Sequence, residues 1–205
     1  DLIDWQSEAN FDLVRKYFGN QIFGALGNHE YSPDMWLSDP KEQHVEAYKD
    51  LSRDTLAQVY PFDLSFHSQV IHGVNFIAID DVYCTVTPEQ VKRFYEEVKR
   101  GLPIILCMHV PFYTDDLWRA SRRFWSSKEG ERFRSARVDH NSSYKIQQED
   151  PVTRDFINYL KQEPLLKGIL CGHEHITVQD RFSPTAIQYS VAGNFQFHGQ
   201  EILFV

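Results

Sequence analysis

The spacing of apolar and polar residues predicts four helices. In the first, Phe11 and Val14 fall on one face, and Gly19 follows as a helix terminator. In the third, Thr87-Pro88-Glu89-Gln90 combines an N-cap hydroxyl, a first-turn proline and a capping-box glutamine. The expected helices cover residues 6–18, 41–59, 87–99 and 153–162.

Short apolar runs between these stretches predict strands. Residues 62–70 and 74–80 flank His72-Gly73, a plausible hairpin turn. Further strands are expected over residues 21–26, 104–108, 168–171, 178–182, 187–191 and 201–205. This order, βα units followed by a β-rich tail, predicts a layered α/β protein with mixed sheets.

The apolar residues within 113–150 follow neither the spacing of a helix nor that of a strand well. Seven basic residues lie between Arg119 and Arg137, interleaved with aromatic ones such as Trp118 and Trp125. A structureless loop of this length inside a compact domain is usually functional or disordered. Two interpretations stay open: a solvated insertion without a ligand role, and a partly ordered lid whose arginines and aromatic rings face an anionic substrate.

Composition narrows the class of protein. The 205 residues suit one domain spanning 1–205, and 42% apolar with 14% aromatic residues indicates a folded globular chain. No apolar run approaches the roughly 18–20 residues of a membrane span. A net charge of −8 argues against nucleic-acid binding, although metal cations could supply positive charge locally for a small anionic substrate. Nothing in the sequence indicates the oligomeric state.

Three cysteines without a Cys-x-x-Cys spacing imply no disulfide framework, which favours a reducing compartment such as the cytoplasm. The chain begins with Asp1 rather than Met, so we expect the natural protein to continue upstream. A signal peptide therefore cannot be assessed from these residues.

Three segments with histidine follow apolar runs directly. They are Gly27-Asn28-His29-Glu30, then His109, and then Gly172-His173-Glu174-His175. In open α/β sheets, ligands bind in the crevice at the carboxyl ends of the strands. Imidazole nitrogens and an amide oxygen brought together there would suit Mn, Fe or Zn. The chemistry suggested is phosphate-ester hydrolysis by two metal ions held about 3.5–4 Å apart.

These segments resemble the third, fourth and fifth motifs of the calcineurin-like metallophosphoesterases. Asp1-Leu2-Ile3-Asp4 resembles the end of that family's second motif, Gly-Asp-x-x-Asp. The resemblance covers essentially the whole chain. It implies a four-layer α/β/β/α sandwich with two mixed sheets. It also implies hydrolysis of a small phosphate mono- or diester at a dinuclear metal site, with metal-bound hydroxide as nucleophile.

The resemblance also implies a role for each motif residue. Asp1 would bridge both metals, Asn28, His109 and His173 would complete one metal's shell, and His175 would join the other. His29 would protonate the leaving oxygen, with the Asp4 carboxylate orienting its imidazole. Glu30 and Glu174 are expected to support the ligands or to be solvated rather than to bind metal.

One departure from the family leaves alternatives open. The first motif, Asp-x-His, occurs nowhere in the sequence, and we expect it upstream of Asp1. If it is lacking altogether, the chain is a non-catalytic metal-binding or scaffold module. Purple acid phosphatases are close neighbours but carry a tyrosine in place of Asp4, and a nuclease would rest on the basic insertion alone. The remaining histidines are expected to be structural or at the surface, with a weak suggestion that His198 approaches the site: His44, His67, His72, His140 and His198.

Overall fold

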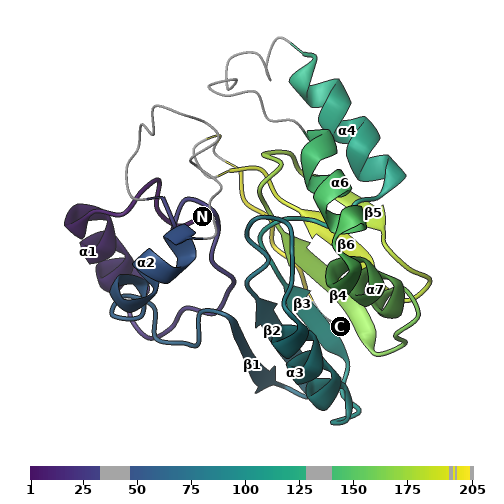
Figure 1. Cartoon of the computed structure of the whole chain (residues 1–205), viewed down its shortest axis with the longest axis horizontal. Coiled ribbons are helices and arrows are strands. Elements are labelled where there is room, and N and C mark those ends of the chain that lie inside the picture. The colour runs from purple at the N-terminus through teal and green to yellow at the C-terminus, as the bar shows by residue number, and fades with distance from the viewer. Residues whose placement is uncertain (33–46, 128–139, 194–195, 197, 204–205) are drawn as a thin grey trace.

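The computed structural model describes residues 1–32, 47–127, 140–193, 196 and 198–203 (Figure 1). The strands are β1 (Phe66–Ile71), β2 (Val74–Ile79), β3 (Ile104–Cys107), β4 (Leu166–Cys171), β5 (Val178–Arg181) and β6 (Ile187–Ser190). The helices are α1 (Glu8–Tyr17), α2 (Ala47–Leu56), α3 (Pro88–Val98), α4 (Asp115–Trp125), α6 (His140–Glu149) and α7 (Pro151–Leu160).

The strands form one mixed sheet in the order β1-β2-β3-β4-β6-β5. The four central strands run parallel, whereas β1 and β5 pair antiparallel with β2 and β6. The expected hairpin is confirmed, because β1 and β2 are joined through His72 (φ 48°) and Gly73 (φ 82°). A two-residue turn in which both residues have a left-handed backbone matches the right-handed twist of the strands that it joins.

One face of the sheet packs against α3 and α7, which lie in front of it in Figure 1. Helix α3 begins where the sequence predicts: Thr87 accepts from Gln90 N, and the Gln90 side chain accepts from Thr87 N. Its Phe94 is fully buried and meets Phe156 of α7 edge-on, with 5.2 Å between ring centroids. These contacts form the larger of two apolar cores.

A second apolar core joins α1, α2 and the chain leading to Tyr31. Phe11 and Val14 are its buried residues on α1, and Leu56 of α2 is fully buried there. Figure 1 shows both helices together beside the β1 edge of the sheet. Of the helix expected over 41–59, the structure confirms α2; residues 41–46 lie outside the described residues.

The prediction of a strand over residues 21–26 was wrong. None of the described residues pairs with this segment in a ladder. Phe23 packs on the sheet, whereas Ile22 and Leu26 belong to the second apolar core. The Phe23 ring lies 4.6 Å from His67 and 6.2 Å from Phe76, centroid to centroid. Residues 201–203 also form no strand, with Leu203 81% exposed, and 204–205 lie outside the described residues.

Among the described residues of 113–150 there are two helices, α4 and α6, which the sequence analysis missed. On α4, Leu117, Ser121 and Trp125 are buried at four-residue spacing, and the Thr114 hydroxyl caps the helix. The sequence analysis did not recognise this buried helix face because its central residue is a serine rather than an apolar residue. Residues 128–139, which hold several of the basic residues, lie outside the described residues.

The mixed α/β fold is thus present, with one sheet among the described residues. The second sheet and the four-layer arrangement stay predictions, as does a single domain over 1–205. No helix in the described part of the chain combines the length and the apolar character needed to cross a membrane.

Phe94→Ala should lower the free energy of unfolding by about 3–5 kcal/mol, because it removes a fully buried ring from the larger core. Urea denaturation measures this difference. Tyr95→Ala, next along the same helix but 38% exposed, is the matched control. Equal losses for the two variants would contradict the placement of the core.

Candidate metal centre

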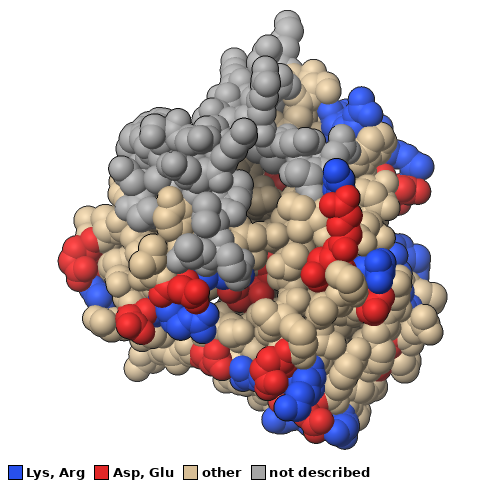
Figure 2. Space-filling model, viewed as in Figure 1, with Lys and Arg blue, Asp and Glu red and all other residues tan. Residues whose placement is uncertain are grey.

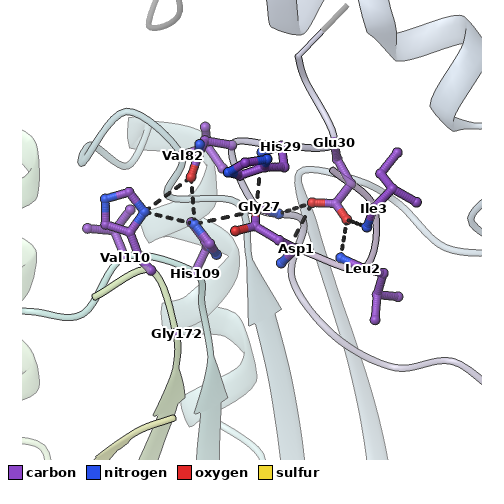
Figure 3. A network of polar contacts seen from close by, with 12 residues as sticks. Asp1, Leu2, Ile3, Gly27, His29, Glu30, Val82, His109, Val110 and Gly172 are labelled. Atoms are coloured by element: carbon purple, nitrogen blue, oxygen red, sulfur yellow. Dashed lines mark hydrogen bonds and ion pairs between the residues drawn. The ribbon is translucent and has the colours of Figure 1, made fainter. Parts of the chain in front are cut away.

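The parallel pair β3 and β4 brings two of the histidine segments to one edge of the sheet. His109 lies two residues beyond the end of β3, and His173 lies two residues beyond the end of β4. Cys107, the last residue of β3, is paired in register with Leu170, the next-to-last residue of β4. Asn28 and Asp1 come from the segments outside the sheet and meet the histidines there. Figure 3 shows Asp1 beside His109.

Three side-chain atoms converge at this edge. Asn28 Oδ1 lies 2.8 Å from His109 Nε2 and 3.1 Å from His173 Nδ1, and the two nitrogens are 3.0 Å apart. Neighbouring ligands of an octahedral ion, each bonded at about 2.1 Å, would lie about 3.0 Å apart. Within the described residues, no group of three or more His, Cys, Asp and Glu has a metal-binding arrangement. The amide oxygen of Asn28 is therefore essential to this set, which we call the ligand triangle.

Asp1 lies beside the ligand triangle. Its Oδ1 accepts a hydrogen bond from His29 N at 3.1 Å and lies 3.6 Å from His109 Nε2. Gly27 makes this approach possible, because a β-carbon there would overlap the Asp1 carboxylate, lying 2.6 Å from its Cγ. A residue without a side chain is needed at Gly27 for a steric reason that the sequence alone does not reveal.

His29 is oriented by a main-chain group. Its Nδ1 lies 2.8 Å from the carbonyl oxygen of Asp4, not from the carboxylate that the resemblance implies. A carbonyl oxygen only accepts, so Nδ1 carries the proton and Nε2 is left to exchange one with a substrate. Asp4 itself is exposed.

His173 and His175 lie in a strained turn. Both have left-handed backbones, with φ of 62° and 55°, which is uncommon for residues other than glycine. Non-glycine residues held in this region cluster at functional sites. The His175 ring lies 6.1 Å from the Trp125 ring of α4, centroid to centroid, and contributes no atom to the ligand triangle. Its place on a second metal stays a prediction.

Glu30 fixes the two ligand segments outside the sheet. Its carboxylate is 1% exposed and accepts from Leu2 N at 2.6 Å, Gly27 N at 2.7 Å and Ile3 N at 3.3 Å (Figure 3). The Tyr60 hydroxyl donates to it as well. Glu30 thus ties the main chain beside Asp1 to the main chain beside Asn28, which agrees with the expected supporting role.

Asp81 anchors the segment that carries His109 in the same way. The sequence analysis did not identify Asp81. Its buried carboxylate accepts from His109 N at 2.8 Å and from Val110 N at 3.1 Å. Burial raises the pKa of Asp81 to about 7, against the lowering effect of these hydrogen bonds. The available signal was the pair Asp80-Asp81 at the end of an apolar run, beside the strand that leads to His109.

Glu174 holds the turn between the last two histidines. It is 5% exposed and accepts from the Ser121 hydroxyl of α4 at 2.9 Å. The turn is therefore anchored to a helix that local periodicity did not reveal. This is again a supporting role rather than a solvated one.

Burial also sets the protonation of His109. Desolvation is the largest cause that lowers its pKa well below 6.5, and the nearby imidazoles of His173 and His29 lower it further. The imidazole is therefore neutral near pH 7. Neutral imidazole is the form that binds a metal ion.

The other histidines lie away from the ligand triangle or outside the described residues. His67 stacks on Phe62 with 4.2 Å between ring centroids, and His72 occupies the hairpin turn. His198 is exposed. His44 and the side chain of His140 lie outside what the structure describes.

A family model described as calcineurin-like phosphoesterase matches residues 1–177. The chain belongs to the calcineurin-like phosphoesterase family. No curated protein matches it. The solved structures similar to this calcineurin-like phosphoesterase chain include two that are named as phosphate-ester hydrolases.

The first similar structure is a protein assigned as a 5'-nucleotidase from Staphylococcus aureus, in complex with alpha-ketoglutarate. It is 15% identical with a TM-score of 0.45, and the match covers 91% of this chain and 35% of that chain. The second is a dimetal phosphatase from Danio rerio. It is 10% identical with a TM-score of 0.43, and the match covers 83% of this chain and 60% of that one.

Glu30→Gln should lower the free energy of unfolding of the metal-free protein by about 1–3 kcal/mol. The amide has one acceptor oxygen and would turn its NH₂ group toward buried N–H donors. Urea denaturation measures the loss. Glu89→Gln, whose side chain is 68% exposed on α3, should leave stability nearly unchanged. A Glu30→Gln protein as stable as this control would contradict the anchoring role.

Proposed function

We propose that this chain carries out metal-dependent hydrolysis of a small phosphate mono- or diester. The observation that supports it most is the ligand triangle of Asn28, His109 and His173, with Asp1 beside it, in a chain of the calcineurin-like phosphoesterase family. Oxygen and imidazole donors brought together in this way fit Mn, Fe or Zn.

Five residues are the proposed metal ligands. Asn28, His109 and His173 would hold one ion, Asp1 would bridge to a second, and His175 would bind that second ion. When bound, the two ions supply positive charge to the phosphoryl group and activate the attacking water. The protein keeps the ligand atoms in place before binding, because Glu30, Asp81 and Glu174 anchor the chain around them.

His29 is assigned as the general acid. Its Nδ1–H is held by the Asp4 carbonyl, so the ring orientation is fixed and Nε2 donates the proton to the departing oxygen. The Asp1 carboxylate, which accepts from His29 N, places this ring next to the ligand triangle.

A small substrate suits the charge of the surface better than a nucleic acid does. Acidic and basic side chains alternate over the described part of the face drawn in Figure 2, where no continuous basic surface is present. The net charge of the whole sequence is −8. A polyanion would need a basic face along its backbone.

His173→Ala should lower the metal content and the metal affinity of the protein, because it removes one corner of the ligand triangle. Elemental analysis and calorimetric titration with Mn²⁺ or Zn²⁺ measure both. His72→Asn is the control, since it changes an exposed histidine in a turn where asparagine tolerates the left-handed backbone. Unchanged metal content in His173→Ala would remove this residue from the site.

His29→Ala should reduce kcat on an aryl phosphate ester about 10²–10⁴-fold while leaving the metal content unchanged. Asp4→Asn should change kcat by less than about threefold, because the main-chain carbonyl remains. A large loss in Asp4→Asn would restore the carboxylate to the mechanism. Failure of the unaltered metal-loaded protein to hydrolyse any mono- or diester would favour a non-catalytic module.

A further inference from the structure

A shallow aromatic groove lies between α4 and α6. We define it by the residues that line it and that the argument uses: Tyr113, Leu117, Trp118, Ser121, Tyr144 and Glu174. Three of these six side chains are aromatic. Ligand sites in proteins combine such flat apolar surfaces with a few polar groups.

The aromatic groove is built on the segments that carry the ligand triangle. Glu174, which lines it, stands between His173 and His175, and its carboxylate accepts from Ser121 across the groove floor at 2.9 Å. The chain after His109 forms another part of the wall through Pro111 and Tyr113. The two chain segments that follow β3 and β4 therefore line the groove and also carry the histidines of the candidate metal centre.

Helix α6 is bonded to one of those extensions by a buried glutamine. Gln147 is 1% exposed, donates to Pro111 O at 3.0 Å and accepts from Tyr113 N at 3.3 Å. This pair of hydrogen bonds fixes the position of α6, and with it Tyr144, relative to the segment that carries His109.

Two of the rings that line the groove lie against each other. Tyr113 and Tyr144 lie with 3.8 Å between ring centroids and 33° between planes, and Tyr144 is 37% exposed. The Arg122 guanidinium lies 4.8 Å from the centroid of the Trp118 ring. A planar ring entering from solvent would meet aromatic surface next to a cationic rim, and aromatic pairs are favoured beyond their buried area.

We propose that the aromatic groove binds the alcohol part of the substrate, so that the preferred substrates are phosphate esters whose alcohol carries an aromatic ring. The inference rests on the proposed phosphoesterase function. The phosphoryl group would lie at the ligand triangle, and the ring would lie against Tyr144 and Trp118. Tyr144 and Trp118 would then set substrate preference without touching the reacting atoms.

Benzyl phosphate and cyclohexylmethyl phosphate test this inference in the metal-loaded protein. Both esters release a primary alcohol with a six-membered ring, and only the aromatic character of the ring differs. We expect kcat/KM to be about three- to tenfold higher for benzyl phosphate. Equal values for the two esters would overturn the inference.

Variants at Tyr144 locate the preference. Tyr144→Ala and Tyr144→Leu should both reduce the ratio of the two kcat/KM values toward one, since leucine keeps apolar volume but has no ring. Tyr95→Ala is the matched control, because Tyr95 is 38% exposed on α3 and pairs with Tyr159 at 4.7 Å, centroid to centroid. A ratio that survives both Tyr144 changes would overturn the inference, even if the alanine variant folds poorly.

A binding measurement separates this inference from the proposed function. In saturation-transfer NMR on metal-free protein, benzyl alcohol should receive a stronger signal from the unaltered chain and Tyr95→Ala than from Tyr144→Leu. Binding of the ring without any ester hydrolysis would sustain the groove and contradict the proposed function. Ester hydrolysis without a Tyr144-dependent signal from benzyl alcohol would sustain the proposed function and contradict the groove.

Discussion

Buried carboxylates that accept main-chain N–H groups are the constraint on which the candidate site depends. Glu30 and Asp81 are 1% and 2% exposed, and burying a carboxyl group is costly unless its oxygens are hydrogen-bonded. Their partners are the N–H groups beside Asp1, Asn28 and His109. Bonds from N–H to a charged acceptor are stronger than those between neutral groups. The segments that carry the ligands are therefore held by interactions with the backbone, which leaves the ligand side chains free to converge.

This arrangement also accounts for the strained turn that carries His173 and His175. A left-handed backbone at a residue other than glycine costs of order 1–3 kcal/mol. Such a turn persists when its surroundings restrict it. The contact from Ser121 to Glu174 and the packing of Trp125 near His175 place α4 against the turn. The same helix forms one side of the aromatic groove, so the elements that support the candidate metal ligands also shape the neighbouring surface.

Local patterns predicted the elements whose hydrogen bonds are local. The capping box at Thr87 and the hairpin at His72-Gly73 are confirmed, because their signals lie within a few residues. The apolar run at 21–26 misled the prediction, since an isolated strand pattern does not say whether a neighbour exists to pair with it. Helix α4 was missed for a related reason. Its buried Ser121 is hydrogen-bonded to Glu174, fifty-three residues away in the sequence, and a contact over that separation leaves no sign in the local spacing of apolar residues.

The sequence by itself determined the chemistry of the candidate site, because the donor types of Asn28, His109 and His173 and their positions after apolar runs are local properties. Only the tertiary structure decided which atoms meet. It placed Nδ1 of His173 and Nε2 of His109 against one amide oxygen, and it gave the contact with His29 to the Asp4 carbonyl rather than to the carboxylate. It also revealed Asp81 as an anchor and a steric reason for Gly27. These choices depend on contacts between residues far apart in the chain, and such contacts are set by packing, which residue type and spacing do not specify.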